Sequence, residues 1–335
     1  MGKKIGIDLG TANTLIYVGG RGIVMCAPSV VAVEQQTRRV LAVGSGAKKM
    51  IGKTPGSITA YRPIRDGVIA DFDVTSLMIQ KFLRRVDAGS FFNRPSVIVG
   101  MPCGINEVEK RAIEDATFEG GARSVALIEE PIAAAIGSGL RVAGPRGSMI
   151  ADIGGGTTEV AVIALGGIVV SRSLNVAGDG FDADIIRYIR SERGILIGEA
   201  TAELLKVRVG SVHKKVNRGT LNVYGRSMKT GLGVEFTVSS DEIREATADG
   251  VMKIISAIRS TLEETPPELS ADIYDFGIML TGGGSLIGGL GQKITDETSL
   301  RVTYAKRPLE SVCIGIGRVI ESTGSLAGAV RFRQR

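Results

Sequence analysis

"DIGGGTTEV" occupies residues 152–160, and a related stretch, "DLGTANTLIYV", occupies residues 8–18. When the two are aligned, Asp8 falls on Asp152 and Gly10 falls on Gly154. Around each stretch the chain runs through short apolar segments cut by glycines and then through segments with helical periodicity. This repeat predicts two similar α/β domains that face each other across a cleft, and clefts between domains are favoured ligand sites.

Both stretches predict loops that bind phosphate. Consecutive glycines expose backbone N–H groups and let the chain approach an oxygen-rich ligand closely. Asp8 and Asp152 each end an apolar run, and a carboxylate that faces phosphates needs a cation between them. We therefore expect Mg²⁺, held by the two aspartates largely through water. One such loop alone could be an ordinary hairpin turn, whereas two matching loops favour a clamp on a single polyphosphate.

A third glycine-rich stretch, "TGGGSLIGGL" at residues 281–290, follows the apolar run "FGIML". Its glycines would let a flat ring lie against the backbone, which is consistent with an adenosine site. The sequence has no G-x-x-x-x-G-K-[ST] motif, so a P-loop is excluded. The glycines at 282–284 also lack the spacing and the acidic partner of a Rossmann fingerprint.

The composition is that of an ordinary globular protein with a mildly basic charge. The chain has 335 residues, 44% of them hydrophobic, and a net charge of +6. No run of five like charges occurs and Trp is absent, so we expect anionic partners such as phosphate or lipid headgroups, and no nucleic acid. We expect no secretory signal and no membrane-spanning segment, because no apolar run is long enough.

The cysteines are few and lie far apart in the sequence, at Cys26, Cys103 and Cys313. This usage fits a protein of the reducing cytoplasm. We expect all three side chains to be buried as small hydrophobic residues.

Local patterns predict several individual elements. Residues 74–86 are amphipathic at the helical period. The apolar stripe of this helix is expected to be Leu77, Met78, Phe82 and Val86. Asn106 is the predicted N-cap of a helix that ends at a Gly-Gly pair, and residues 29–44 predict a hairpin. Residues 240–269 predict one long helix with a serine N-cap and a Pro-Pro stop.

Four motifs together resemble the actin, chaperone-ATPase and sugar-kinase superfamily, and the whole chain resembles its MreB family of bacterial actins. The stretches "DLGTANT", "EEPIAAAIG", "DIGGGTTEV" and "TGGGSLIGGL" resemble, in that order, its phosphate-1, connect-1, phosphate-2 and adenosine motifs. The resemblance implies an α/β actin-like fold, in which two duplicated RNase H-like domains surround a central nucleotide cleft. It implies four subdomains, with IA at 1–31, 66–140 and 319–335, IB at 32–65, IIA at 141–180 and 244–318, and IIB at 181–243.

The resemblance also implies roles for residues at matching positions. Glu130 would orient the water that attacks ATP, with help from Thr157; taken alone, an acid here would be read as a helix cap. Glu203 and Lys206 match a pair that contacts ribose and adenine, the alternative being a solvent-facing ion pair one helical turn apart. The full set expected to bind the nucleotide is Thr11, Ala12, Asn13, Gly154, Gly155, Gly156, Glu203, Leu204, Leu205, Lys206, Gly282, Gly283, Gly284, Ser285 and Leu286.

The function that the resemblance implies is that of an ATP-dependent, filament-forming cytoskeletal protein with a slow ATPase coupled to polymerisation. Its partners would be further copies of itself, the inner membrane surface, and membrane proteins of cell-wall synthesis and morphogenesis. It would guide rod cell shape from the cytoplasmic side of the membrane. Phe91 and Phe92, flanked by Arg84, Arg85 and Arg94, resemble the membrane-insertion loop of MreB proteins that have no N-terminal amphipathic helix. The alternative is that both rings pack beneath their loop.

Other members of the superfamily remain as alternatives. A small-molecule kinase usually carries an insertion for its acceptor substrate, and none is obvious in this sequence. A chaperone ATPase needs an appended substrate domain, and a scaffold locked to its nucleotide would show no turnover. The sequence also departs from the family at Ser285, where alanine is usual, and at Lys306 and Arg307, where acids are common. These departures bear on partners and filament packing.

Overall fold

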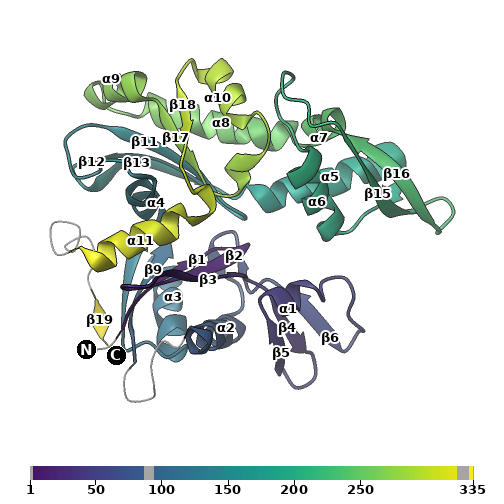
Figure 1. The fold of residues 1–335 in the computed structure, drawn as a ribbon, viewed down its shortest axis with the longest axis horizontal. Coiled ribbons are helices and arrows are strands. Elements are labelled where there is room, and N and C mark those ends of the chain that lie inside the picture. The colour runs from purple at the N-terminus through teal and green to yellow at the C-terminus, as the bar shows by residue number, and fades with distance from the viewer. Residues whose placement is uncertain (1–2, 87–93, 323–331, 335) are drawn as a thin grey trace.

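The computed structural model describes residues 3–86, 94–322 and 332–334. Two large α/β halves lie one above the other, and each carries a smaller unit on the same side (Figure 1). The lower half in Figure 1 is formed mainly by the N-terminal part of the chain, drawn in purple and blue. The upper half follows in teal, green and yellow.

The two large sheets are built in the same way. In each, three antiparallel strands form a meander, and two parallel strands are added beside its first strand. The first sheet has the order β19-β10-β9-β1-β2-β3, with bounds Arg333–Gln334, Ser124–Glu129, Ser96–Met101, Lys4–Leu9, Asn13–Val18 and Gly22–Pro28. The second has the order β13-β12-β11-β17-β18, with bounds Gly167–Leu174, Thr158–Ala164, Ser148–Ile153, Ile278–Thr281 and Val302–Tyr304. The predicted duplication of a meander-and-helix unit is confirmed.

Helices cover both faces of each large sheet, which explains why the central strands read as continuous apolar runs. In β11, Ile150 packs into the core between the two sheets, whereas Met149 and Ala151 pack into the outer core. The helices against the outer faces are α2 (Phe72–Arg85) and α3 (Glu107–Glu119) on the first sheet, and α8 (Ala248–Glu263), α9 (Pro267–Phe276) and α10 (Leu290–Thr298) on the second. Between the sheets lie α4 (Glu130–Ser138) and α11 (Ser311–Glu321).

The two central helices cross at backbone contact. A Cβ atom on Gly137 of α4 would lie 1.8 Å from the carbonyl oxygen of Ser311. A Cβ atom on Gly315 of α11 would lie 1.8 Å from the carbonyl oxygen of Ala133. Only glycine fits at these two positions, so the core between the halves depends on a pair of residues without side chains.

A small three-stranded sheet belongs to each half. The lower one has the order β5-β4-β6, with bounds Val40–Val43, Val31–Glu34 and Ile58–Tyr61, and carries α1 (Ser45–Lys48). The upper one has the order β14-β15-β16, with bounds Ile195–Leu196, Thr220–Ser227 and Gly233–Ser239, and packs with α5 (Gly178–Arg193), α6 (Glu199–Val209) and α7 (Ser240–Ala246). A two-stranded ribbon, β7 (Ile64–Arg65) and β8 (Val68–Ile69), joins the lower sheet to α2. The hairpin predicted within residues 29–44 is confirmed as β4 and β5.

The predicted N-cap at Asn106 is confirmed. Its side chain accepts hydrogen bonds from the N–H groups of Val108 and Glu109, and Glu109 reaches back to the Asn106 N–H at 2.8 Å. This is a complete capping box at the start of α3.

Three other local predictions are wrong. Leu77 does not belong to the apolar stripe of α2, because it is 38% exposed. The buried side chains of that helix include Val74, Met78, Ile79, Phe82 and Leu83. The long helix at 240–269 is interrupted at Thr247, whose hydroxyl donates to the Ile243 carbonyl at 2.8 Å, and the N-cap is Ser239. Cys26 is exposed, since it lies on β3 at the edge of its sheet.

Candidate functional site

The two predicted phosphate loops face each other across the floor of a cleft between the halves. A Cβ atom on Gly155 would lie 2.6 Å from the Cβ of Ala12, and one on Gly156 would lie 2.7 Å from Thr11 Oγ1. Any side chain at either position would push the loops apart, so glycine is required for this approach. Asp8 and Asp152 each occupy the second-to-last position of the first strand in their meander. The internal repeat therefore brings its two copies to one place.

Hydrogen bonds fix the shape of the second loop. The Gly154 N–H donates to the Thr157 carbonyl at 2.8 Å, which closes the turn. The N–H groups of Gly178 and Asp179, at the start of α5, donate to the carbonyls of Gly154 and Gly155. The loop is thus held against a helix N-terminus, a position that favours anions.

The third glycine stretch passes directly beside the second loop. Gly282 has φ +81°, and a Cβ atom there would lie 2.4 Å from Asp152 Oδ1. A Cβ atom on Gly284 would lie 2.7 Å from the side chain of Ile153. The close approach brings residues 282–284 into the wall of the same cleft as the two loops.

Carboxyl groups gather at the floor of this cleft. Burial, and then the charge of Asp152, raises the pKa of Asp8 to about 7. Burial raises the pKa of Asp152 to about 7. Burial also raises the pKa of Glu130 well above its ordinary range, with further contributions from Asp8, Asp152 and Glu159. Several acids in one desolvated place disfavour each other's ionised forms, so the floor favours a bound cation.

Glu130 is the first residue of α4 and lines the cleft. Glu129, the N-cap residue, makes no side-chain hydrogen bond that caps the helix. Glu130 lies in the first turn, where the helix dipole favours an acid, and it also faces the cavity, so its position fits both the cap interpretation and the site interpretation.

Glu203 and Lys206 do not form the solvent-facing ion pair that their spacing allows. Lys206 Nζ donates to the Gly178 carbonyl and to Asp182 Oδ2, both at 2.7 Å. Glu203 accepts from Lys48 Nζ at 2.8 Å, across the gap between the two small units. Both residues nevertheless line the cleft.

Most of the predicted site residues form one cavity of about 240 Å³. The predicted residues in its wall are Asp8, Thr11, Ala12, Asn13, Glu130, Asp152, Gly154, Gly155, Gly156, Thr157, Glu203, Lys206, Gly282, Gly283 and Gly284. Four predicted residues do not line it: Leu205 is fully buried in the core of the upper small unit, Ser285 is fully buried beside Gly282, and Leu204 and Leu286 are a little under half exposed. Phe91 and Phe92 lie outside the described residues.

Sequence reasoning missed several residues of the wall, which come from segments far apart in the chain. They are Leu9, Gly10, Leu15, Gly67, Gly178, Asp179, Val207, Pro308, Leu309 and Val312. Gly10 could have been found from the repeat, because it aligns with Gly154. Leu309 and Val312 carry no such signal, since only the packing of residues 308–312 beside the third loop places them there.

Within the parts of the chain that the structure describes, no helix combines the length and apolar character needed to cross a bilayer. Among the same residues, no three His, Cys, Asp or Glu side chains are arranged to enclose a metal ion by themselves. His213 Nε2 lies 2.9 Å from Asp296 Oδ2, so the lone histidine has a structural partner.

The paired loops and duplicated sheets define an actin-like fold, and comparison with solved structures confirms it. MreB 5 of Spiroplasma citri bound to AMPPNP matches with a TM-score of 0.91 at 40% identity, over 96% of each chain. The chain belongs to the MreB/Mbl protein family, which it matches over residues 2–327. It is 46% identical to the cell shape-determining protein Mbl of Bacillus cereus, over 97% of both chains. It is 49% identical to the cell shape-determining protein MreB of Escherichia coli, over 95% of this chain and 93% of that protein.

Proposed function

We propose that this protein is an ATP-dependent, filament-forming cytoskeletal protein that hydrolyses ATP slowly. The observation that carries the proposal is the contact between Gly155 and Ala12, which sets two phosphate loops from two halves around one cavity. One polyphosphate can then be held from both sides by backbone N–H groups. In support, a solved relative, MreB 5 of Spiroplasma citri, is described as bound to AMPPNP.

The chemistry of the cleft floor fits Mg²⁺. Asp8 and Asp152 would hold the ion largely through water, because two carboxylates and no enclosing cage are what Mg²⁺ with a phosphate ligand prefers. A bound divalent cation would neutralise charge on the phosphates. It would also favour the ionised forms of these two acids, whose pKa values are raised mainly by burial.

Glu130 and Thr157 are proposed to position the attacking water. Both line the cleft at the second phosphate loop and the start of α4. Burial raises the pKa of the Glu130 carboxyl above its ordinary range, and a carboxylate with a raised pKa is a stronger proton acceptor when it is ionised. The hydroxyl of Thr157 would fix the orientation of the same water by hydrogen bonding.

The actin-like division into subdomains is proposed with the bounds that the sequence implies. The lower small sheet would be IB and the upper small unit IIB. The expected contact with the adenosine, from Glu203, Lys206 and the third loop, would lie between IIA and IIB.

Polymerisation and cell shape are proposed from the relatives. The cell shape-determining proteins Mbl and MreB share nearly the whole length of this chain. The test is light scattering after adding Mg-ATP to purified protein with no acceptor substrate present. Assembly is expected with ATP and with AMPPNP. Absence of assembly, together with ATP consumption only when a small-molecule acceptor is added, would instead identify a kinase.

We further propose that filaments attach to the inner membrane surface through Phe91 and Phe92 and work with membrane proteins of cell-wall synthesis. Burying both rings would contribute roughly 3–6 kcal/mol, which holds one monomer weakly against the entropic cost of association. A filament repeats the contact, so attachment should depend on polymerisation. Phe91→Ala/Phe92→Ala should still polymerise but fail to float with anionic vesicles. Flotation equal to that of the wild type would refute this anchor.

A further inference from the structure

A second cavity lies beside the nucleotide cleft, at the mouth between the two small units. Its volume is about 510 Å³, within the usual range for small-molecule sites. One wall comes from residues 45–62 of the lower unit, and the other comes from α5 and α6 of the upper unit. It contains none of the three glycine loops, so it is distinct from the phosphate site.

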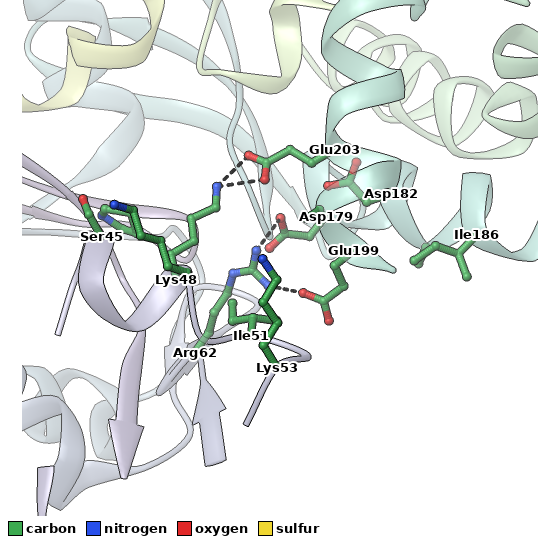
Figure 2. A pocket seen from close by; sticks show the side chains of 14 residues that line it. Ser45, Lys48, Ile51, Lys53, Arg62, Asp179, Asp182, Ile186, Glu199 and Glu203 are labelled. Carbon is green, nitrogen blue, oxygen red and sulfur yellow. Dashed lines mark hydrogen bonds and ion pairs between the residues drawn. The ribbon is translucent and has the colours of Figure 1, made fainter. Parts of the chain in front are cut away.

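Ion pairs already balance the acids of this cavity. Figure 2 shows Lys48 and Arg62 reaching across to the acids on α5 and α6. Lys48 Nζ lies 2.8 Å from Glu203, and Arg62 lies 3.3 Å from Glu199 and 3.8 Å from Asp179. The remaining acid, Asp182, is paired with Lys206 at 2.7 Å. The acidic wall therefore has little charge left for a cationic ligand.

The wall from the lower unit carries positive charges that these ion pairs do not neutralise. Lys49 and Lys53 line the cavity and are exposed, and no carboxylate of the described residues lies within ion-pairing distance of either. Arg62 Nε is buried and has no hydrogen-bond acceptor in the described part of the chain. A buried donor without an acceptor is costly, so a ligand that accepts a hydrogen bond there would remove that cost. One buried acceptor, Asp182 Oδ1, also lacks a partner and could take a ligand hydroxyl.

Apolar side chains form the rest of the cavity. Ile51 of the lower unit and Ile186 of α5 lie on opposite walls, with Pro28, Ala183 and Ala200 also lining the space. A fully hydrated inorganic anion would leave this surface uncovered. A ligand with a short hydrocarbon body would cover it and gain from its burial.

We propose that this cavity binds a small amphiphilic anion, that is, a carboxylate or phosphate on a short apolar body. The charged group would lie against Lys49, Lys53 and Arg62, and the apolar body between Ile51 and Ile186. Because Asp179 and Glu203 line both cavities, the ligand and the nucleotide share two wall residues. Occupancy of one site should therefore change affinity at the other by a reciprocal factor; this coupling, unlike the binding itself, rests on the proposed function.

Four probes with the same tail test the proposal by calorimetric titration of the full-length, nucleotide-free protein. Octanoate and octyl phosphate are expected to bind, and octylamine and octanol to bind at least about tenfold more weakly. If octyl phosphate binds more tightly than octanoate, the ligand is a phosphorylated compound. If octanoate binds more tightly, the ligand is a carboxylic acid. Equal binding of all four probes, or preference for octylamine, would overturn the proposal.

Variants locate the binding. Lys49→Gln/Lys53→Gln should weaken the better anionic probe about tenfold, because two charge-assisted contacts are lost. Ile186→Asn should weaken it as well, whereas Lys229→Gln, an exposed lysine on the β15–β16 hairpin, should not. Retention of full affinity in both cavity variants would place the probe elsewhere and refute the site. Titrations repeated with saturating AMPPNP test the coupling separately: an unchanged probe affinity would refute the coupling and leave the binding result standing.

Discussion

The acids of the cleft floor predict an unusual dependence of stability on pH in the nucleotide-free protein. Asp152 has a folded-state pKa of about 7, raised by burial from an ordinary 3.8. A group with a raised pKa stabilises the fold while it is protonated. That contribution is complete below pH 3.8 and is lost as the pH rises through about 7. The protein without nucleotide should therefore be more stable at pH 6 than at pH 8.

The size of the effect follows from the pKa. One group that titrates at about 7 when folded, and is already ionised when unfolded, changes the free energy of unfolding by about 1.4 kcal/mol between pH 6 and pH 8. Asp152→Asn removes that contribution and also removes the charge that adds to the effect of burial in raising the pKa of Asp8. The variant should therefore lose at least about 1.4 kcal/mol of the wild-type difference between the two pH values.

The assay is urea unfolding at pH 6 and pH 8, followed by circular dichroism. The matched control is Asp275→Asn, at an exposed aspartate that has no ion pair within the described residues. Mg-ATP should also reduce the pH dependence of the wild type, since a cation at the cleft floor favours the ionised acids. If Asp152→Asn kept the whole pH dependence of the wild type, the account of the cleft floor would be wrong.

Two further predictions concern hydrolysis and the central helices. Glu130→Ala should bind ATP but release phosphate about 10²- to 10⁴-fold more slowly, whereas Glu129→Ala should remain close to wild type; a wild-type rate for Glu130→Ala would remove its assigned role. Gly137→Ala should lower the free energy of unfolding by about 1–3 kcal/mol, because the new methyl group would lie 1.8 Å from the Ser311 carbonyl oxygen. Gly144→Ala, where a Cβ meets nothing within 4 Å, is its control, and equal urea midpoints for the two variants would contradict the packing argument.

Features that repeat or that act locally could be predicted from the sequence. The aligned loops at Asp8 and Asp152 indicated the duplicated sheets and the shared cleft, and the capping box at Asn106 needs only residues within one turn. The helix in residues 74–86 was correctly predicted, but its buried face was not, because Leu77 was assigned to it. One residue turns the helix by about 100°, so Leu77 falls outside the buried sector of Val74 and Met78.

Features that depend on contacts between distant segments could not be predicted. The ion pair between Lys48 and Glu203 joins residues 155 positions apart, and neither position has a local pattern that indicates the other. Leu205 was expected at the nucleotide together with Glu203 and Lys206, yet a helix turns adjacent side chains away from one another, and Leu205 points into a core. The break at Thr247, where the backbone leaves helical geometry at φ −97° and ψ 1°, likewise has no local pattern in the sequence that indicates it.

The backbone contact between α4 and α11 has a mechanical consequence. Because Gly137 and Gly315 bring no side chains to this crossing, the two helices meet backbone to backbone there, within a core that also holds Ile136, Val312 and Ile316. At the opposite end, the small units are joined by partly exposed ion pairs, which resist separation by only about 0–1 kcal/mol each. The two halves are thus joined tightly where α4 crosses α11 and only weakly where the small units meet. Separating the small units would therefore cost less than separating the two large sheets, and a ligand bound between the small units would add most to the cohesion of the molecule at that end.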